Sequence, residues 1–379
     1  MGPACRYRQE ATEGVELNER IDRLRQRMVE AGADAVLVSQ PGNRRYLSGF
    51  TGHDSTSGSS AGWVLVTRDE AMLLVGFLSM EQAKRECPDL GLRDTAGKPS
   101  VLVGQLARER GFRRLLGEGS HLTHAAFVEL QSQLPSDCEL VSFEGWVEEM
   151  RSRKDESEIA TIRRAAELTD RALEHVLGVV RPGMSERAIA WEAERYLREH
   201  GAEGPAFDVG VATGPNTSLP HNPPGERQLQ VGEPIWIDMG AQVDGYCADL
   251  TRTFCLGEPE VRLREVWDIV HRAQQTAIDS CRPGMTGPEV DGIARQIITE
   301  AGYGPGFGHS LGHGVGLVVH ELPRLSQQST DVISTENVVT FEPGIYLEGW
   351  GGVRIEDLGV IRQGVVELLS AAPKRLSIG

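Results

Sequence analysis

The stretch Ile235-Trp-Ile-Asp-Met-Gly-Ala-Gln-Val-Asp-Gly-Tyr-Cys-Ala-Asp-Leu-Thr-Arg-Thr-Phe254 decides the fold, because it predicts a β-hairpin with two acidic side chains on one face. Its Asp244-Gly245 pair lies between apolar and β-branched runs, which is a strong hairpin signal. If that pair forms the turn, Asp238 lies opposite Thr251. Side chains alternate along a strand, so Asp238 and Asp249 share a face as diagonal neighbours about 7 Å apart. Two inward carboxylates repel each other and resist burial, so this hairpin requires a positive partner.

A second acidic hairpin and a group of histidines follow downstream. Phe341-Glu-Pro-Gly-Ile-Tyr346 and Gly351-Gly-Val-Arg-Ile-Glu-Asp357 flank a predicted loop, in a register that puts Glu342 opposite Glu356. Before them, His309-Ser-Leu-Gly-His-Gly-Val-Gly-Leu-Val-Val-His320 holds three of the ten histidines of the chain. Four converging carboxylates cannot all be ionised in a core without cations. Oxygen ligands with one imidazole suit a pair of divalent metals such as manganese, cobalt, zinc or iron.

The order of predicted elements indicates an α/β (α+β) chain of two domains, as expected for 379 residues. We expect a loose leader over residues 1–14, a smaller α/β domain over 15–150 and a larger domain over 151–379. In the first domain, Gln40-Pro-Gly-Asn43 is interpreted as a turn. The larger domain contains two similar halves, each a helix pair followed by a hairpin. Pro182-Gly-Met-Ser185 and Pro283-Gly-Met-Thr286 occupy matching places in these halves, where each pair breaks one helix and caps the next.

Composition limits the classes of partner. A net charge of −16 argues against nucleic acid or an anionic membrane as the main partner. No run approaches the eighteen or so apolar residues of a membrane span. The six cysteines show no metal-ligand spacing and the first residues lack an apolar core, which favours a reducing cytoplasm. Cys247 and Cys255 flank the first acidic hairpin and are expected to pack rather than react.

The acidic residues and His313 carry a family resemblance. Asp238, Asp249, His313, Glu342 and Glu356 match, in order and spacing, the five metal ligands of the pita-bread metallopeptidases, which include methionine aminopeptidase, aminopeptidase P and prolidase. The resemblance is close over about residues 155 to 370, and it implies a pita-bread fold with pseudo-twofold halves. It is looser over the first domain, where residues 43–52, Asn-Arg-Arg-Tyr-Leu-Ser-Gly-Phe-Thr-Gly, are similar to the aminopeptidase P and prolidase pattern. The resemblance therefore implies a creatinase-like N-terminal domain, which methionine aminopeptidases lack.

The resemblance also implies roles for single residues. Asp249 and Glu356 would bridge two metal ions, Asp238 would complete one ion, and His313 with Glu342 would complete the other. Glu342 would also be the general base. The remaining implied roles are contacts with the scissile amide and oxyanion for His221 and His320, and substrate-pocket or supporting positions for His309, Arg354 and Tyr346.

The implied activity is hydrolysis of Xaa-Pro bonds in short proline-containing peptides, with two divalent ions per chain. An Xaa-Pro dipeptidase (prolidase) is favoured, and aminopeptidase P is the alternative. The loops that distinguish them would include Arg44 or Arg45 from a partner subunit, since the resemblance implies a homodimer. Two further readings remain open: a pita-bread hydrolase or lyase acting on a small non-peptide substrate, and a non-catalytic peptide-binding relative. Relatives of the last kind typically lose the ligands, whereas this sequence has all five.

Overall fold

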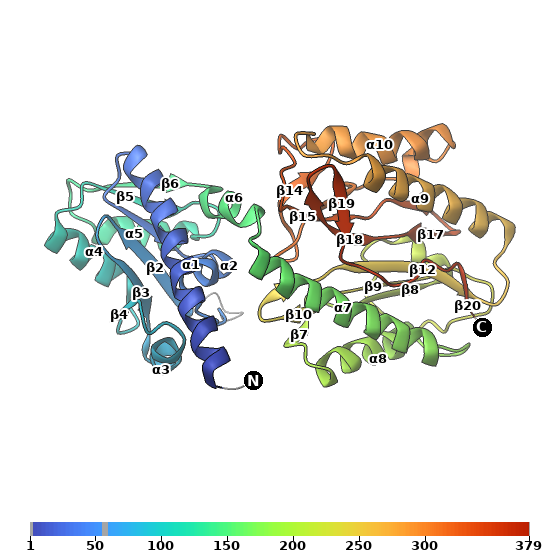
Figure 1. The fold of residues 1–379 in the computed structure, drawn as a ribbon, viewed down its shortest axis with the longest axis horizontal. Helices are drawn as coiled ribbons and strands as arrows, with labels where there is room; N and C mark the ends of the chain where they lie inside the picture. The colour runs from blue at the N-terminus through green and yellow to red at the C-terminus, as the bar shows by residue number, and fades with distance from the viewer. Residues whose placement is uncertain (1–2, 55–59, 379) are drawn as a thin grey trace. The chain divides into compact units, whose positions relative to one another are not determined.

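The computed structural model describes the backbone of residues 3–54 and 60–378, with the side chains of the first helix from residue 17 onward. The chain divides into two compact units, Met1–Met150 and Arg151–Gly379. Figure 1 shows both units, each built from helices packed on sheets. Among the helices of the described ranges, none combines the length and the apolar character that a membrane crossing requires.

The N-terminal unit is a mixed sheet with helices on its faces. Its six strands lie in the order β4-β3-β2-β1-β5-β6, with β1 antiparallel to β2 and parallel to β5. Helices α4 and α5 cover one face, where Val103 and Leu130 pack against Leu37 and Leu65. The strands are β1 (Ala35–Val38), β2 (Gly62–Thr67), β3 (Ala71–Val75), β4 (Gly91–Asp94), β5 (Arg114–Glu118) and β6 (Glu139–Phe143). The helices are α1 (Pro3–Glu30), α2 (Pro41–Ser48), α3 (Phe77–Glu86), α4 (Pro99–Arg110), α5 (His124–Gln133) and α6 (Trp146–Ser152), the last of which runs into the second unit.

Two predictions for this unit are wrong. The loose leader expected over residues 1–14 belongs, from Pro3 onward, to helix α1; residues 1 and 2 lie outside the described residues. The leader is rich in glutamate, arginine and alanine, which favour helix, whereas the apolar periodicity used for the prediction begins only after it. The expected turn at Gln40–Asn43 is the start of α2: Pro41 occupies the first turn, and the Gln40 side chain accepts a hydrogen bond from the Asn43 N–H at 2.6 Å.

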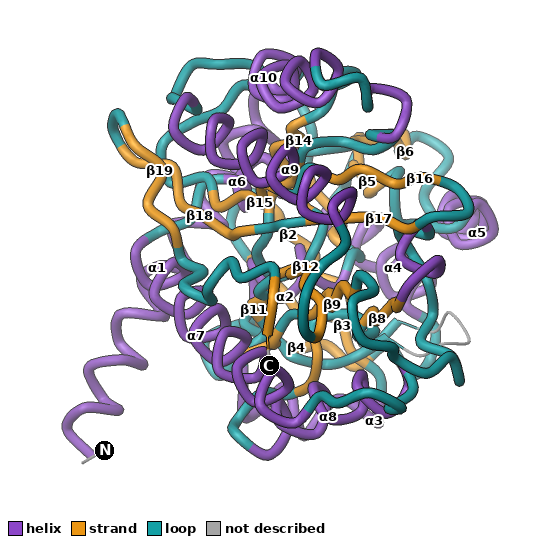
Figure 2. The backbone as a smooth tube through the Cα atoms, turned by 90° about the vertical axis from the view of Figure 1, so that its right-hand side faces the viewer, coloured by secondary structure: helices purple, strands orange, loops and turns teal. Residues whose placement is uncertain are grey.

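The second unit places its strands between two pairs of helices. Figures 1 and 2 show α7 and α8 on one side of the strands, and α9 and α10 on the other. The helices are α7 (Glu156–Val179), α8 (Glu186–Glu199), α9 (Val261–Ser280) and α10 (Gly287–Glu300), with short 3₁₀ turns η1 (Gly214–Ser218) and η2 (Gly304–Gly306). The strands of its first half are β7 (Gly204–Pro205), β8 (Gly210–Thr213), β9 (Ile235–Met239), β10 (Ala241–Val243), β11 (Tyr246–Cys247) and β12 (Leu250–Leu256). Those of its second half are β13 (Gly312–Gly314), β14 (Glu321–Leu325), β15 (Val338–Phe341), β16 (Gly344–Leu347), β17 (Gly351–Arg354), β18 (Asp357–Arg362), β19 (Val365–Leu368) and β20 (Ser377–Ile378).

The two halves repeat one hydrogen-bond pattern at the matching Pro-Gly-Met motifs. Gly183 N–H donates to Leu229 O at 2.9 Å, and Leu229 N–H donates to Met184 O at 2.9 Å. Gly284 and Ile333 form the equivalent pair of bonds in the second half, each at 2.8 Å, with Met285 in the place of Met184. Ser185 and Thr286 then cap α8 and α10, as predicted. The repeat in the sequence is therefore also a repeat in the backbone.

The registers of both acidic hairpins are confirmed. Strand β9 pairs with β12 so that Asp238 lies opposite Thr251. The second hairpin pairs Gly344 with Arg354 in β16–β17, and the same register continues into β15–β18, where Phe341 lies opposite Asp357. Because the side-chain period of a strand is two, a slip of one residue would have turned every acid to the other face. The two registers therefore determine which side chains share the interior of this unit.

Candidate metal centre

Three carboxylates from the two acidic hairpins meet inside the second unit. Asp238 lies in β9, Asp249 directly precedes β12, and Glu356 lies between β17 and β18. One carboxylate oxygen from each lies within 4.8 Å of the other two. Asp249 and Glu356 are 6% and 2% exposed, so their charges are almost completely removed from water.

His313 and Glu342 join this group from the second half. His313 Nε2 lies 3.2 Å from Glu342 Oε1 and 3.7 Å from Asp249 Oδ2. The other ring nitrogen, Nδ1, lies 3.1 Å from the Gly314 carbonyl oxygen, which can only accept a hydrogen bond. Nδ1 therefore carries a hydrogen, and Nε2 is the ring nitrogen that faces the acids, as in a metal-ligating histidine. All five residues predicted as ligands are brought together.

The charges of the buried acids are balanced only in part, by Arg354 and His313. Burial, followed by Glu356, raises the pKa of Asp249 well above its ordinary range. Burial and, second, the negative charge of Glu342 raise the pKa of Glu356 well above its ordinary range. Burial also raises the pKa of Asp238. Burial would raise the pKa of Glu342 too, but the hydrogen bond and charge of His313 lower it to about 2. The cluster therefore strongly favours the binding of a cation.

Two oxygens of the cluster have no hydrogen-bond partner. Among the described residues, Asp238 Oδ1 and Glu356 Oε1 are buried and unbonded, although the second oxygen of each carboxylate is hydrogen-bonded. A buried acceptor without a partner costs about 1–3 kcal/mol, and more when it is charged. Hard oxygen donors with one imidazole are the ligand set of divalent ions such as manganese, cobalt or zinc. The residues present therefore fit divalent metal ions.

Arg354, Tyr346 and His309 form a chain of hydrogen bonds that starts at the cluster. Arg354 Nη2 donates to Asp238 Oδ2 at 2.6 Å, and Nη1 donates to the Tyr346 hydroxyl at 3.0 Å. His309 Nε2 lies 3.1 Å from that hydroxyl. Burial raises the pKa of Tyr346 to about 12, so the phenol stays protonated. The three residues predicted for the substrate pocket thus form one connected group.

His320 and His221 flank the ligands from two loops. The His320 ring lies 4.3 Å from the His313 ring, centroid to centroid. Burial, then the charges of His313 and His221, lower the pKa of His320, which keeps its ring neutral. His221 is exposed, and its loop is tied to Arg354, whose Nη1 donates to the Pro220 carbonyl at 3.2 Å. His320 therefore lies beside a predicted ligand, and the loop of His221 is bonded to the arginine of the predicted substrate pocket.

Sequence reasoning missed Glu186, which holds the loop of His221. Its carboxylate is completely buried at the start of α8 and accepts hydrogen bonds from the Thr213 N–H at 2.9 Å, Asn216 Nδ2 at 2.9 Å and the Gly225 N–H at 3.1 Å. The Asn222 side chain adds a contact at 3.4 Å. The only signal in the sequence was an acid in the first turn of a helix, which is common for electrostatic reasons alone.

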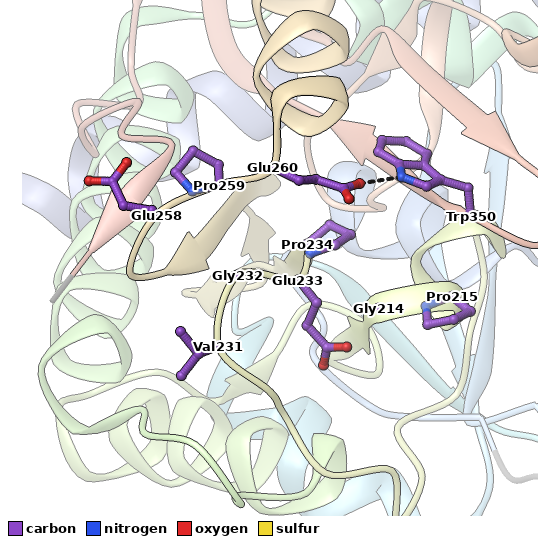
Figure 3. Close-up of a pocket in the computed structure, with 10 residues that line it drawn as sticks. All are labelled: Gly214, Pro215, Val231, Gly232, Glu233, Pro234, Glu258, Pro259, Glu260 and Trp350. Carbon is purple, nitrogen blue, oxygen red and sulfur yellow. Dashed lines mark hydrogen bonds between the residues drawn. The ribbon is translucent and has the colours of Figure 1, made fainter.

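A surface pocket of about 470 Å³ in the same unit does not include any of the predicted site residues. Figure 3 shows Trp350, Glu233 and Glu260 among its lining residues. Its acids already have partners, since Glu233 accepts two hydrogen bonds at 2.6 Å from Arg227 and Glu260 is bonded to the Trp350 indole. We therefore assign the chemistry of this unit to the acid cluster.

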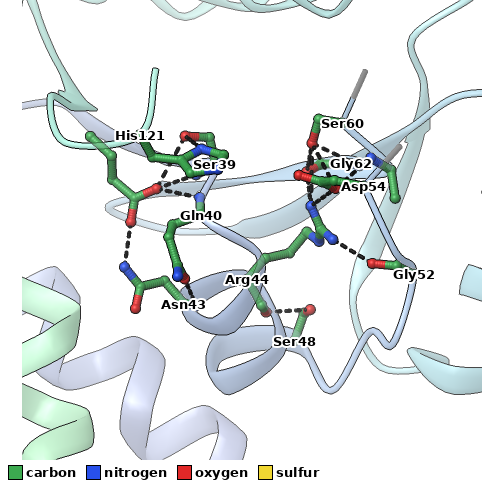
Figure 4. A network of polar contacts seen from close by, with 12 residues as sticks. Ser39, Gln40, Asn43, Arg44, Ser48, Gly52, Asp54, Ser60, Gly62 and His121 are labelled. Atoms are coloured by element: carbon green, nitrogen blue, oxygen red, sulfur yellow. Dashed lines mark hydrogen bonds and ion pairs between the residues drawn. The ribbon is translucent and has the colours of Figure 1, made fainter. Parts of the chain in front are cut away.

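The polar network of the N-terminal unit is structural (Figure 4). Arg44, one of the arginines expected to act across a subunit interface, is fully buried, with Nη1 2.8 Å from Asp54 Oδ1 and 3.0 Å from the Gly62 carbonyl oxygen. Its guanidinium is thus occupied within its own unit, which corrects the expectation for Arg44. Ser39 lies 3.1 Å from His121 Nδ1, but at 1% exposure it cannot meet a substrate.

The cysteines beside the first acidic hairpin pack, as expected. Burial raises the pKa of Cys247 to about 12 and that of Cys255 to about 11. Both thiols therefore stay protonated at neutral pH, which removes their nucleophilic and metal-binding form.

Comparison with known protein families matches both units. A model of metallopeptidase family M24 matches residues 160–363, and a model of the creatinase/prolidase N-terminal domain matches residues 20–153. The chain is 36% identical over 360 residues to an Xaa-Pro dipeptidase from Pyrococcus furiosus, covering 95% of this chain and 100% of that one.

Solved structures agree over nearly the whole chain. An Xaa-Pro dipeptidase from Bacillus anthracis superposes with a TM-score of 0.90 at 38% identity, covering 96% of this chain and 100% of that one. An X-Pro aminopeptidase from Thermotoga maritima superposes with a TM-score of 0.83 at 35% identity, covering 92% and 98%.

Proposed function

The chain belongs to metallopeptidase family M24, and from this premise we propose that it hydrolyses Xaa-Pro bonds in short peptides as an Xaa-Pro dipeptidase. The expected fold, a creatinase-like N-terminal domain before a pita-bread domain, is confirmed by the family models and the solved relatives. One observation carries the proposal. The three carboxylates of Asp238, Asp249 and Glu356 converge within 4.8 Å in a chain that covers all of a dipeptidase relative.

We propose that this centre holds two divalent ions, of manganese, cobalt or zinc. Asp238, Asp249, His313, Glu342 and Glu356 would hold them. Support comes from the unbonded oxygens Asp238 Oδ1 and Glu356 Oε1 and from His313 Nε2, which faces Asp249 and Glu342. Bound divalent ions supply a Lewis acid for a carbonyl and lower the pKa of water.

The protein's own groups would move the protons and stabilise charge. Glu342 is ionised at neutral pH because its hydrogen bond to His313 lowers its pKa to about 2, and from its place beside the other acids we assign it the role of general base. His320, with its pKa lowered and its ring beside His313, would donate a hydrogen bond to the oxyanion, and the exposed His221 would contact the scissile amide. Arg354, Tyr346 and His309 would form one wall of the substrate pocket.

A bond to proline explains why such a site is useful. Proline has no amide N–H and its ring restricts the backbone, so an Xaa-Pro bond does not fit a site that binds substrate N–H groups. A centre that activates the carbonyl and water directly has no need of that hydrogen. We propose short proline-containing peptides as the partners, a homodimer as the assembly and the cytoplasm as the location. The five cysteines with described side chains are all unpaired, as a reducing compartment would keep them.

Aminopeptidase P activity is the second candidate, because an X-Pro aminopeptidase is 35% identical to this chain. A panel of Xaa-Pro dipeptides, Xaa-Pro-Xaa tripeptides and non-proline dipeptides, assayed with each metal, separates the candidates. Hydrolysis of Xaa-Pro dipeptides alone is the expected result. Cleavage of the tripeptides would select the aminopeptidase. Hydrolysis of none of these peptides would overturn the proposal in favour of a small non-peptide substrate.

A further inference from the structure

Thr251 lies between two residues of the metal centre and is itself completely buried. Its hydroxyl oxygen is 2.7 Å from Glu356 Oε2 and 3.0 Å from Arg354 Nε. The threonine is on β12, opposite Asp238 on β9. A side chain from the first hairpin therefore contacts a carboxylate of the second.

The direction of both hydrogen bonds is determined by Arg354. A guanidinium N–H can only donate, so the Thr251 oxygen accepts from Arg354 Nε. The single hydroxyl hydrogen is then available to Glu356 Oε2, at a distance normal for a bond to a carboxylate. This contact distinguishes the two oxygens of Glu356: Oε2 is bonded, and Oε1 is buried without a partner. The hydroxyl thereby selects which oxygen remains for an ion.

The backbone of Glu356 is held by other bonds. Its N–H donates to the Thr251 carbonyl oxygen at 3.0 Å, and its carbonyl oxygen accepts from Arg252 Nη1. Arg354 likewise keeps its bonds to Asp238 and Tyr346 without the threonine. Loss of the Thr251 hydroxyl would therefore remove its bonds to Glu356 Oε2 and Arg354 Nε and leave the strands in place.

We propose that Thr251 is a positioning residue for the metal centre, whose hydroxyl orients the Glu356 carboxylate so that Oε1 stays available to an ion. The inference rests on the proposed function, because it assumes that divalent ions bind here. The Thr251 hydroxyl also bonds Arg354 Nε. It therefore holds the Glu356 carboxylate and the arginine of the substrate pocket in fixed positions relative to each other.

The test compares Thr251→Val, which is nearly isosteric but lacks the donor, with Thr251→Ser, which keeps it. Chelator-treated protein is titrated with Mn²⁺ by calorimetry, and the visible absorption of bound Co²⁺ is recorded. We expect Thr251→Val to bind about 10- to 100-fold more weakly with an altered Co²⁺ spectrum, as is typical when a residue that orients a ligand is lost. Thr251→Ser should remain within about threefold of wild type, since it retains the hydroxyl.

Thr253 offers a matched control. It is a buried threonine two residues along the same strand, and its hydroxyl bonds only backbone atoms, at 2.7 Å to Arg354 O and 3.0 Å to Arg354 N. Thr253→Val should lower the unfolding temperature as much as Thr251→Val while leaving the Mn²⁺ affinity and the Co²⁺ spectrum unchanged. If Thr251→Val did not fold, Thr251→Ser alone would still test the proposal. A roughly 10- to 100-fold loss of Mn²⁺ affinity in Thr251→Ser would contradict it.

Three outcomes overturn the inference: wild-type affinity in Thr251→Val, loss of affinity in Thr251→Ser, or an equal loss in Thr253→Val. Each of them leaves the proposed hydrolysis intact, because wild-type protein would still bind metal. Failure of wild-type protein to bind any Mn²⁺ or Co²⁺ would instead overturn the proposed function, and with it this inference. The two failures are therefore distinguishable in one titration series.

Discussion

Arg354 and Asp238 form an ion pair inside the metal centre, with Nη2 2.6 Å from Oδ2. The arginine side chain is 5% exposed, and its other nitrogens donate to Thr251, Tyr346 and the carbonyl oxygen of Pro220. The guanidinium therefore holds one oxygen of the carboxylate and leaves Oδ1 unbonded. The positive partner that the first acidic hairpin required is thus in part an arginine, supplied by the second hairpin.

Replacing that arginine by lysine should damage the centre although the charge is retained. Arg354→Lys loses the planar fork that reaches all four acceptors at once. We expect a roughly 10- to 100-fold loss in Mn²⁺ affinity, measured by calorimetry, together with a fall in kcat/KM on an Xaa-Pro dipeptide. Arg264→Lys is the control, because Arg264 is exposed and lies 3.7 Å from Glu258. Wild-type behaviour of Arg354→Lys would show that charge alone suffices.

Glu342→Gln separates catalysis from metal binding. The amide keeps an oxygen for a metal ion and for His313, but it cannot accept a proton at neutral pH. General base catalysis contributes about 10²- to 10⁴-fold, so kcat on an Xaa-Pro dipeptide should fall by that factor. Metal content, measured by mass spectrometry on protein loaded with Mn²⁺, should stay at the wild-type value. Normal turnover in this variant would refute the assignment of Glu342 as the base.

Local signals in the sequence were sufficient for the strand registers. Asp244-Gly245 alone placed Asp238 opposite Thr251, because a two-residue turn determines every pair beyond it. Once the registers were set, the acids had to share an interior. The start of α2 was missed because Pro41-Gly42 is as typical of a turn as of a first helical turn, and only the Gln40 cap distinguishes them.

The supporting residues could not be identified in the same way. Thr251 was already on the ligand face in the predicted register, yet threonine is common in strands and signals nothing by its type. Its role depends on Arg354 and Glu356, which are more than 100 positions further along the chain. Glu186 depends likewise on a loop that begins 27 positions later. Such long-range partners follow only from the fold.

The metal-free protein should lose stability as pH rises. The pKa values of Asp238, Asp249 and Glu356 are raised above ordinary values of 3.8 for aspartate and 4.5 for glutamate, so the folded state holds protons that the unfolded chain has released. The stability from these groups is present below the unfolded pKa and is lost as pH rises through the folded one. The unfolding temperature of chelated protein should therefore fall as pH rises through the raised pKa values of these carboxyls.

Added Mn²⁺ should oppose this loss of stability, since ions at 100 times Kd stabilise the fold by about 2.7 kcal/mol. Scanning calorimetry at each pH, with and without the ion, measures both effects. Asp249→Asn should flatten the pH profile of the metal-free protein. The buried Asp249 carboxyl destabilises the fold when it ionises, whereas the asparagine amide does not titrate. A flat profile in chelated wild-type protein, or an unchanged slope in Asp249→Asn, would contradict the explanation.

Glu186→Gln should impair turnover without touching the metal. The buried carboxylate accepts from the N–H groups of Thr213 and Gly225 and from the Asn216 amide, whereas a glutamine must turn one N–H group toward these donors. The loop that carries His221 should then loosen. A misplacement of about 1 Å can cost about 10²-fold, so we expect a 10- to 100-fold fall in kcat/KM on an Xaa-Pro dipeptide.

The matched control is Glu192→Gln on the same helix, whose carboxylate is part-exposed and bonded to Arg195 and His175. It should keep wild-type kcat/KM. In both variants the Mn²⁺ affinity should stay within about twofold of wild type, because neither residue contacts a ligand. A Glu186→Gln enzyme with normal kcat/KM would mean that the His221 loop keeps its position without the carboxylate, whereas a loss of Mn²⁺ affinity would mean that Glu186 supports the acid cluster itself rather than the loop.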